Sequence, residues 1–143
     1  MRAADVMHAG ALVVSADDTV RFAAAKMASA TVDMLPVEDC GVLVGVVTDR
    51  DIVVRCAARG KDAGRTSVRE IMTPGVVYCF EDQHVRSAAH LMESQRIRHL
   101  AVLNRDSGLV GTISLDDLAA REGAEGLACE VMHLLALSGG LRD

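Results

Sequence analysis

The stretch of sequence that decides the fold is written twice. "GVVTDRDIVV" occupies residues 45–54, and "GTISLDDLAA" occupies residues 111–120. Each copy has a glycine, two mostly β-branched residues, a hydroxyl residue, two variable residues, an aspartate and then an apolar run. A motif that recurs within 143 residues indicates an internal repeat, so one unit and its copy should account for the fold.

The repeat reaches well beyond this motif. "DVMHAG", which contains Met7, matches "EIMTPG", which contains Met72, at an offset of 65 residues. Met27 and Met92 share that offset, and from the two motif glycines onward the offset becomes 66. The second copy has therefore gained one residue, which we place in the polar turn sequence "NRDSG".

Each copy predicts the element order β-α-β-β-α. An apolar stretch, 11–15 or 76–80, is typical of a strand, and a helix with a periodic apolar face follows it. A pair of strands comes next, and a second helix starts at the repeated hydroxyl residue. The apolar helix faces consist of Val20, Ala23, Ala24, Met27 and Ala28 in the first copy and of Val85, Ala88, Ala89 and Met92 in the second.

These elements predict an α+β fold, namely a tandem repeat with pseudo-twofold symmetry and an extra C-terminal helix. The expected boundaries are 5–63 for repeat 1, 68–121 for repeat 2 and 124–137 for the helix, which repeat 1 lacks. The polar, glycine-containing stretch 59–67 is typical of a linker between two repeats.

The composition disfavours several classes of protein. A net charge of −5 and a scarcity of aromatic residues (2%) disfavour nucleic-acid binding, which relies on basic surfaces and on stacking. No apolar run approaches the roughly 20 residues of a membrane span, and Asp5 and His8 interrupt the region where a signal peptide needs an apolar core. We therefore expect a soluble cytoplasmic protein without nucleic-acid or membrane partners.

The four cysteines are widely spaced and form no C-x-x-C motif. In a cytosolic chain of this length they are expected to be buried small side chains rather than a disulfide framework. Cys40 lies in an expected turn and is the cysteine most expected to be exposed.

The repeated hydroxyl-x-x-Asp has two interpretations. Thr48 with Asp51, and Ser114 with Asp117, fit a capping box, in which the hydroxyl and the carboxylate each accept a backbone N–H at a helix start. The same helix start follows a strand and offers free N–H groups to an anion, while an unengaged carboxylate would suit two ribose hydroxyls. The residues alone leave both interpretations open.

At this point the chain resembles a family. The residues around Met7 and Met72, with "MLPVE" and "GVVTDRDIV" in one repeat and "IRHLAVL" and "GTISLDDL" in the other, are similar to a CBS-domain pair, or Bateman module. The resemblance covers about residues 5–121 and extends to the stand-alone bacterial type with a short extra helix.

The resemblance implies clefts between the repeats that bind adenosine-containing ligands such as AMP, ADP, ATP or S-adenosylmethionine. It implies that the two motif aspartates hold ribose hydroxyls, that the motif hydroxyls contact ribose or phosphate, and that strand backbone faces the base. Carried over by position, the ligand-binding residues are Val13, Met34, Leu35, Pro36, Thr48, Arg50, Asp51, Tyr78, Arg98, His99, Leu100, Ala101, Ser114 and Asp117.

Two departures from the family pattern indicate which cleft is better suited to a phosphorylated ligand. Ala101 stands where the family usually has proline, which makes the base-facing backbone of repeat 2 less rigid. Arg50 has Asp116 as its counterpart, and an arginine attracts a phosphate that an aspartate repels. We therefore rank the Asp51 cleft above the Asp117 cleft for a phosphorylated ligand, although Arg98 and its neighbours could reach the opposite cleft.

Other constellations are weaker. Cys129 and His133 are four residues apart on the C-terminal helix, so two such helices in a dimer would offer the four ligands of a structural zinc site. Packing at an interface explains the same pair, and we assign no metal site. No nucleophile motif, H-E-x-x-H or Walker glycine loop occurs, so we predict no catalytic residues, no resident cofactor and no enzymatic activity.

The predicted function is therefore that of a stand-alone regulatory CBS pair, which binds an adenosine-containing ligand and signals through an unknown protein partner or a change in assembly. The alternative is a ligand-free, homodimeric protein-interaction module. A homodimer is expected in both cases, because the helix faces and the C-terminal helix are apolar.

Overall fold

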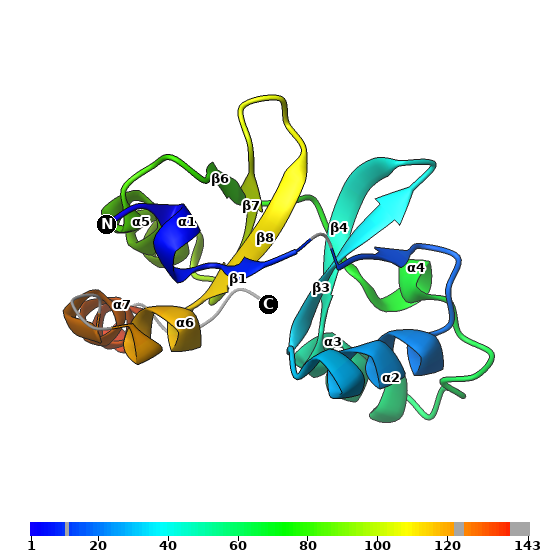
Figure 1. The fold of residues 1–143 in the computed structure, drawn as a ribbon. Coiled ribbons are helices and arrows are strands. Elements are labelled where there is room, and N and C mark those ends of the chain that lie inside the picture. The colour runs from blue at the N-terminus through cyan, green and yellow to red at the C-terminus, as the bar shows by residue number, and fades with distance from the viewer. Residues whose placement is uncertain (11, 122–124, 138–143) are drawn as a thin grey trace. The chain divides into compact units, whose positions relative to one another are not determined.

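The chain folds into two compact units in a computed structural model that describes residues 1–10, 12–121 and 125–137. One unit, here called the continuous unit, is the uninterrupted segment Leu12–Val76. The other, the split unit, combines the N-terminal segment that starts at Met1 with the chain from Val77 onward. Figure 1 shows the dark blue N-terminal segment joined to the green-to-red half of the chain.

The continuous unit is built on a four-stranded sheet with the order β2-β3-β4-β5. β2 is parallel to β3, and the two other pairs are antiparallel. A parallel pair needs a crossover connection, and α2 supplies it. The strands are β2 (Val14–Ser15), β3 (Met34–Asp39), β4 (Val42–Thr48) and β5 (Thr73–Pro74). The helices are α2 (Val20–Ala30), α3 (Asp49–Asp51), which continues as the π-helix η1 (Ile52–Ala57), and α4 (Val68–Ile71).

The split unit repeats this plan with the sheet order β1-β8-β7-β6. β6 is parallel to β7, and α5 makes the crossover between them. The strands are β1 (His8–Ala9), β6 (Tyr78–Phe80), β7 (His99–Leu103) and β8 (Leu109–Ser114). The helices are α1 (Ala3–Val6), α5 (Val85–Gln95), α6 (Leu115–Ala120) and α7 (Glu125–Leu137).

The two repeats exchange their first strands. β1, from the first repeat, pairs with β8 of the second, and β5, from the second repeat, pairs with β4 of the first. The motif glycines permit these pairings: a Cβ on Gly45 would overlap the carbonyl oxygen of Thr73, and a Cβ on Gly111 would lie 2.6 Å from the carbonyl oxygen of His8. Glycine is therefore needed at both positions for close backbone approach.

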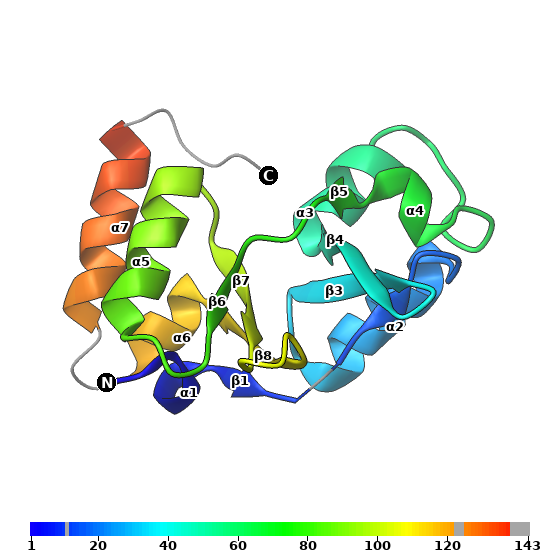
Figure 2. The ribbon, with the colours of Figure 1, turned by 90° about the horizontal axis from the view of Figure 1, so that it is seen from above.

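Each unit has its own apolar core. The predicted helix face is fully buried on α5, whereas on α2 the structure buries Val20, Ala23 and Met27 and leaves Ala28 exposed. The difference has a visible cause in the split unit, where α7 packs against α5 and α6 (Figure 2). α7 places Ala128, Val131 and Leu135 in that core.

The α+β tandem fold with a C-terminal helix is confirmed, with local differences. β2 and β6 are shorter than the predicted stretches 11–15 and 76–80, while residue 11 lies outside the described residues. The short elements α1, β1, α4 and β5 have no counterpart in the prediction. None of the described helices is long and apolar enough to cross a membrane.

Candidate ligand-binding site

The start of α3 in the continuous unit is a complete capping box. The Asp51 backbone N–H donates to Thr48 Oγ1 at 3.1 Å, and the Thr48 N–H donates to Asp51 Oδ2 at 3.0 Å. The hydroxyl-x-x-Asp of this unit therefore has a structural role, as one of its two interpretations predicts.

Asp51 also binds side chains that the sequence did not point to. The Thr73 hydroxyl lies 3.1 Å from Oδ1 and 3.3 Å from Oδ2, and Arg55 Nη1 lies 3.8 Å from Oδ1. Arg55 donates from the same nitrogen to the carbonyl of Met72 at 3.0 Å. With 2% of its surface exposed, Asp51 is a buried junction between the α3 start, η1 and the α4–β5 turn.

The start of α6 in the split unit forms the same box. The Asp117 N–H donates to Ser114 Oγ at 3.1 Å, and the Ser114 N–H donates to Asp117 Oδ2 at 2.8 Å. Among the described residues, Asp117 Oδ1 accepts no hydrogen bond, and the side chain is only partly buried. Asp117 therefore keeps one carboxylate oxygen for another donor.

The residues around the two boxes explain this difference. The position equivalent to Thr73 is occupied by His8, whose side chain is exposed and does not bond to Asp117. The position equivalent to Arg55 is Arg121, whose guanidinium donates to the carbonyl of Asp5. Both arginines thus donate to a backbone carbonyl in or directly after the short helix, α4 or α1, that precedes the exchanged strand. Only Arg55 also lies beside the motif aspartate.

The charges beside the boxes also differ. Arg50 is exposed, and its guanidinium has no partner within the described part of the chain. In the split unit Arg98 Nη2 lies 3.9 Å from Asp116 Oδ1, so the acidic counterpart of Arg50 is partly compensated within its own unit. Both groups of this pair are exposed to solvent, which screens them.

The strand register brings the other predicted residues beside the boxes. Met34 pairs with Thr48 across the β3–β4 hairpin, and His99 pairs with Ser114 across β7–β8. Five of the predicted strand residues are buried: Met34, Leu35, Pro36, Leu100 and Ala101. Leu35 and Leu100 belong to the apolar cores of their units, so only their backbone is available to a ligand.

Val13 and Tyr78 differ although they occupy equivalent positions of the repeat. The Val13 carbonyl accepts from the Lys26 ammonium, and the Val13 side chain is partly buried. Tyr78 lies on the edge strand β6, in register with Ala101, and 46% of its surface is exposed. Its ring meets Phe80 edge to face at 5.6 Å between centroids, so an exposed aromatic ring stands at this position only in the split unit.

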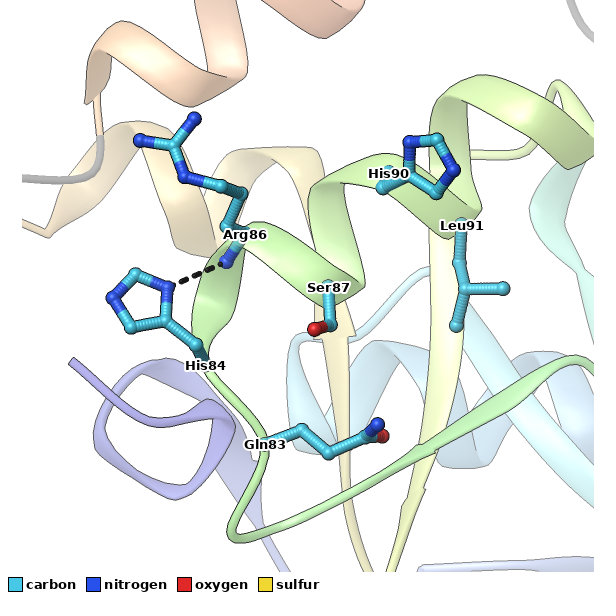
Figure 3. Close-up of a pocket in the computed structure, with 6 residues that line it drawn as sticks. All are labelled: Gln83, His84, Arg86, Ser87, His90 and Leu91. Carbon is cyan, nitrogen blue, oxygen red and sulfur yellow. Dashed lines mark hydrogen bonds between the residues drawn. The ribbon is translucent and has the colours of Figure 1, made fainter.

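A separate hollow of about 670 Å³ lies along α5. Figure 3 shows its lining, Gln83, His84, Arg86, Ser87, His90 and Leu91, and the hydrogen bond from the Arg86 N–H to the His84 ring. None of the predicted ligand-binding residues lines it. The first N–H groups of α5 are bonded to Met1, His84 and its ring, so this helix start has no free donors for an anion.

Shifted pKa values occur at other places. Hydrogen bonds and charge from Arg69 lower the pKa of Asp39, and the Arg105 fork at 2.8 and 2.9 Å lowers the pKa of Asp82. Burial raises the pKa of the Cys79 thiol to about 11.

Cys40 is exposed as predicted, but Cys129 is exposed as well, against the expectation of burial.

Comparisons with known proteins agree with this plan. The model of the CBS domain matches residues 3–57 and 68–122. CBS domain-containing protein YhcV of Bacillus subtilis is 36% identical over 118 residues, which cover 82% of this chain and 83% of YhcV. Hypoxic response protein 1 of Mycobacterium tuberculosis is 30% identical over 120 residues, which cover 82% of each chain.

One similar solved structure contains ligands. The CBS domain pair of protein MJ0100, in complex with 5'-methylthioadenosine and S-adenosyl-L-methionine, matches with a TM-score of 0.73 at 25% identity. The match covers 83% of this chain and 93% of that chain.

Proposed function

Because the chain belongs to the CBS-domain family, as its sequence predicted, we propose that it is a stand-alone regulatory protein that binds an adenosine-containing ligand. The proposed role is binding rather than catalysis, since the match covers 83% of the length of YhcV, which is named only for its CBS domain. Ligand binding would be signalled through a protein partner or a change in a homodimeric assembly, since binding shifts the population of protein states that differ in affinity.

The observation that carries this proposal is the unused oxygen of Asp117. Oδ2 is engaged by the Ser114 N–H, which leaves Oδ1 for a ribose hydroxyl. Charge-assisted hydrogen bonds of this kind are about twice as strong as neutral ones. The β7 backbone at His99–Ala101 and the exposed ring of Tyr78, which is in register with Ala101, would face the base.

This assignment reverses the ranking that Arg50 suggested from the sequence. Asp51 is buried, and both of its oxygens already lie near donors, namely the Thr48 N–H, the Thr73 hydroxyl and the Arg55 guanidinium. A ribose would have to displace the Thr73 hydroxyl from a site with 2% exposure. We therefore assign Asp51 mainly to structure and Asp117 to the ligand.

The charge around Asp117 selects among adenosine compounds. Asp116 and Asp117 give this helix start two carboxylates, of which Arg98 compensates one. The remaining negative charge disfavours a triphosphate and favours a neutral or cationic compound. 5'-Methylthioadenosine and S-adenosylmethionine, the ligands of the MJ0100 complex, have this character.

Isothermal titration with S-adenosylmethionine, 5'-methylthioadenosine, AMP and ATP tests the proposal. We expect the first two to bind, and Asp117→Ala to weaken them by about 1–3 kcal/mol. Asp51→Ala is the matched control and should leave the affinity of folded protein unchanged. Asp116→Asn should improve the binding of ATP. Flat traces with all four compounds would refute the proposal.

A ligand-free, homodimeric interaction module is the second candidate. It is favoured by the capping boxes, which give both motif aspartates a role without a ligand. It predicts that mass spectrometry of the native purified protein finds no adenosine compound, and that Asp117→Ala alters only the melting temperature.

A further inference from the structure

The outer face of α7 carries an unusual set of side chains. Its inner face is buried in the split unit through Ala128, Val131 and Leu135. On the opposite side Cys129, Met132, His133 and Ala136 are exposed. No lysine or arginine occurs between Glu125 and Leu137, whereas a solvent-facing helix surface normally carries long charged side chains.

Two of these exposed side chains are of metal-ligating types. Cys129 and His133 are one helical turn apart, and residues at this spacing have Cβ atoms about 5–6 Å apart on one helix face. A thiolate and an imidazole on such a helix can bind one zinc ion at about 2.3 and 2.0 Å. Neither side chain has a hydrogen-bond or ion-pair partner within residues 1–10, 12–121 and 125–137.

The described residues of one chain do not complete the site. In the described part of the molecule, no three histidine, cysteine, aspartate or glutamate residues gather closely enough to hold a metal ion. Structural zinc is almost always four-coordinate and tetrahedral, so the site needs two further ligands, and a second copy of the chain can offer them. A twofold axis beside α7 would place the same pair opposite the first and give a set of two thiolates and two imidazoles.

The rest of the outer face suits such a contact. Met132, with 47% of its surface exposed, lies between the two ligands in sequence, and Ala136 is small enough for a second helix to approach closely. The neighbouring Glu130 is exposed, and its negative charge attracts a divalent cation.

From these observations we infer that Cys129 and His133 bind zinc together with the same residues of a second copy, so that the α7 helices of two chains form a metal-dependent dimer contact. Each Cys129 thiol releases its proton to solvent when the thiolate binds zinc. The inference does not depend on the adenosine ligand, because none of the residues proposed for that ligand lies on α7.

Full-length protein freed of metal with EDTA and kept reduced is titrated with zinc by calorimetry and by sedimentation. We expect about one zinc ion per two chains, and a dimer dissociation constant that falls at least about tenfold relative to EDTA. Cobalt(II) in place of zinc should give the absorption of a tetrahedral, thiolate-bound ion.

Cys129→Ser and His133→Ala should each abolish both effects, with circular dichroism confirming that the variants fold. Cys40→Ser, which removes another exposed thiol, and His90→Ala, which removes another exposed imidazole, are matched controls and should retain them. Zinc binding that survives both α7 substitutions, a ratio of one ion per chain, or no measurable binding would each overturn the inference.

Discussion

The two hydroxyl-x-x-Asp turns have the same backbone and different surroundings. Thr48–Asp51 and Ser114–Asp117 make the same pair of capping hydrogen bonds, within about 0.2 Å of each other. Asp51 adds Thr73 and Arg55 to this pair, whereas Asp117 adds no described partner. One copy of a repeated motif has become a structural junction, while the other keeps the oxygen that a ligand needs.

Replacing the two aspartates should give the largest difference between the units. Both substitutions remove the carboxylate half of the capping box, which costs about 1 kcal/mol. Asp51→Ala also takes away the partner of the Thr73 hydroxyl and of the Arg55 guanidinium, so it should lower the free energy of unfolding by about 3 kcal/mol in all. Urea unfolding followed by circular dichroism measures both, and equal losses would contradict the comparison. Thr73→Val is the control, and it should account for part of the Asp51 effect.

The second largest effect is expected from replacing the two glycines that lie against the exchanged strands. Gly45→Ala and Gly111→Ala should each destabilise the protein by about 2 kcal/mol, because the new Cβ would press on the backbone of β5 or β1. Gly41→Ala, at a turn where a Cβ would meet nothing within 4 Å, controls for the loss of glycine, although its φ of +78° carries a strain of its own. Hydrogen exchange should become faster in β4 for the first variant and in β8 for the second, and unchanged exchange would count against the strand exchange.

A smaller gain is expected at the end of α2. Thr31 and Arg96 end equivalent helices with φ near 55°, a left-handed conformation that costs a β-branched residue about 1 kcal/mol. Thr31→Gly should therefore stabilise the continuous unit by about this amount. Arg96→Gly should gain less, because arginine is not β-branched and adopts this conformation at a lower cost. Thermal melting of the two variants decides the order.

The smallest effect is expected from acid. Asp39 and Asp82 have pKa values below their ordinary value of 3.8 because Arg69 and Arg105 bond to them. A lowered folded-state pKa means that the stabilisation is complete above about pH 4 and is lost as the pH falls through the folded-state value. Arg69→Gln and Arg105→Gln should each flatten the acid limb of a plot of urea midpoint against pH. A parallel downward shift at all pH values would show that titration is not involved.

The elements that local sequence patterns determine were predicted correctly. The long helices α2 and α5, the two hairpins and both helix starts follow from periodicity and from capping chemistry. The elements α1, β1, α4 and β5 were missed because four-residue helices and two-residue strands have no periodicity of their own. β1 and β5 form because β8 and β4 pair with them, and the repeated glycines at 45 and 111 were the available signal.

The site was predicted less completely than the fold. The hydroxyl-x-x-Asp positions were found, because their spacing is local. The Thr73 hydroxyl, which donates a hydrogen bond to Asp51, is 22 residues away in the chain, and a single sequence does not reveal such a pairing. From the sequence, Asp51 ranked above Asp117 as a ligand-binding residue because of the neighbouring Arg50. In the structure, the burial of Asp51 and its bond to the distant Thr73 reverse that order.

The strand exchange has a consequence for synthesis on the ribosome. Leu12–Val76 contains every strand of its own sheet, so this half can fold as soon as it has emerged. Residues 2–9 leave the ribosome before this half, but β1 finds its partner only when β8 has been translated. β1 must therefore wait, unpaired, while the whole of Leu12–Val76 is made, and removal of residues 2–9 would disturb the half that is completed later.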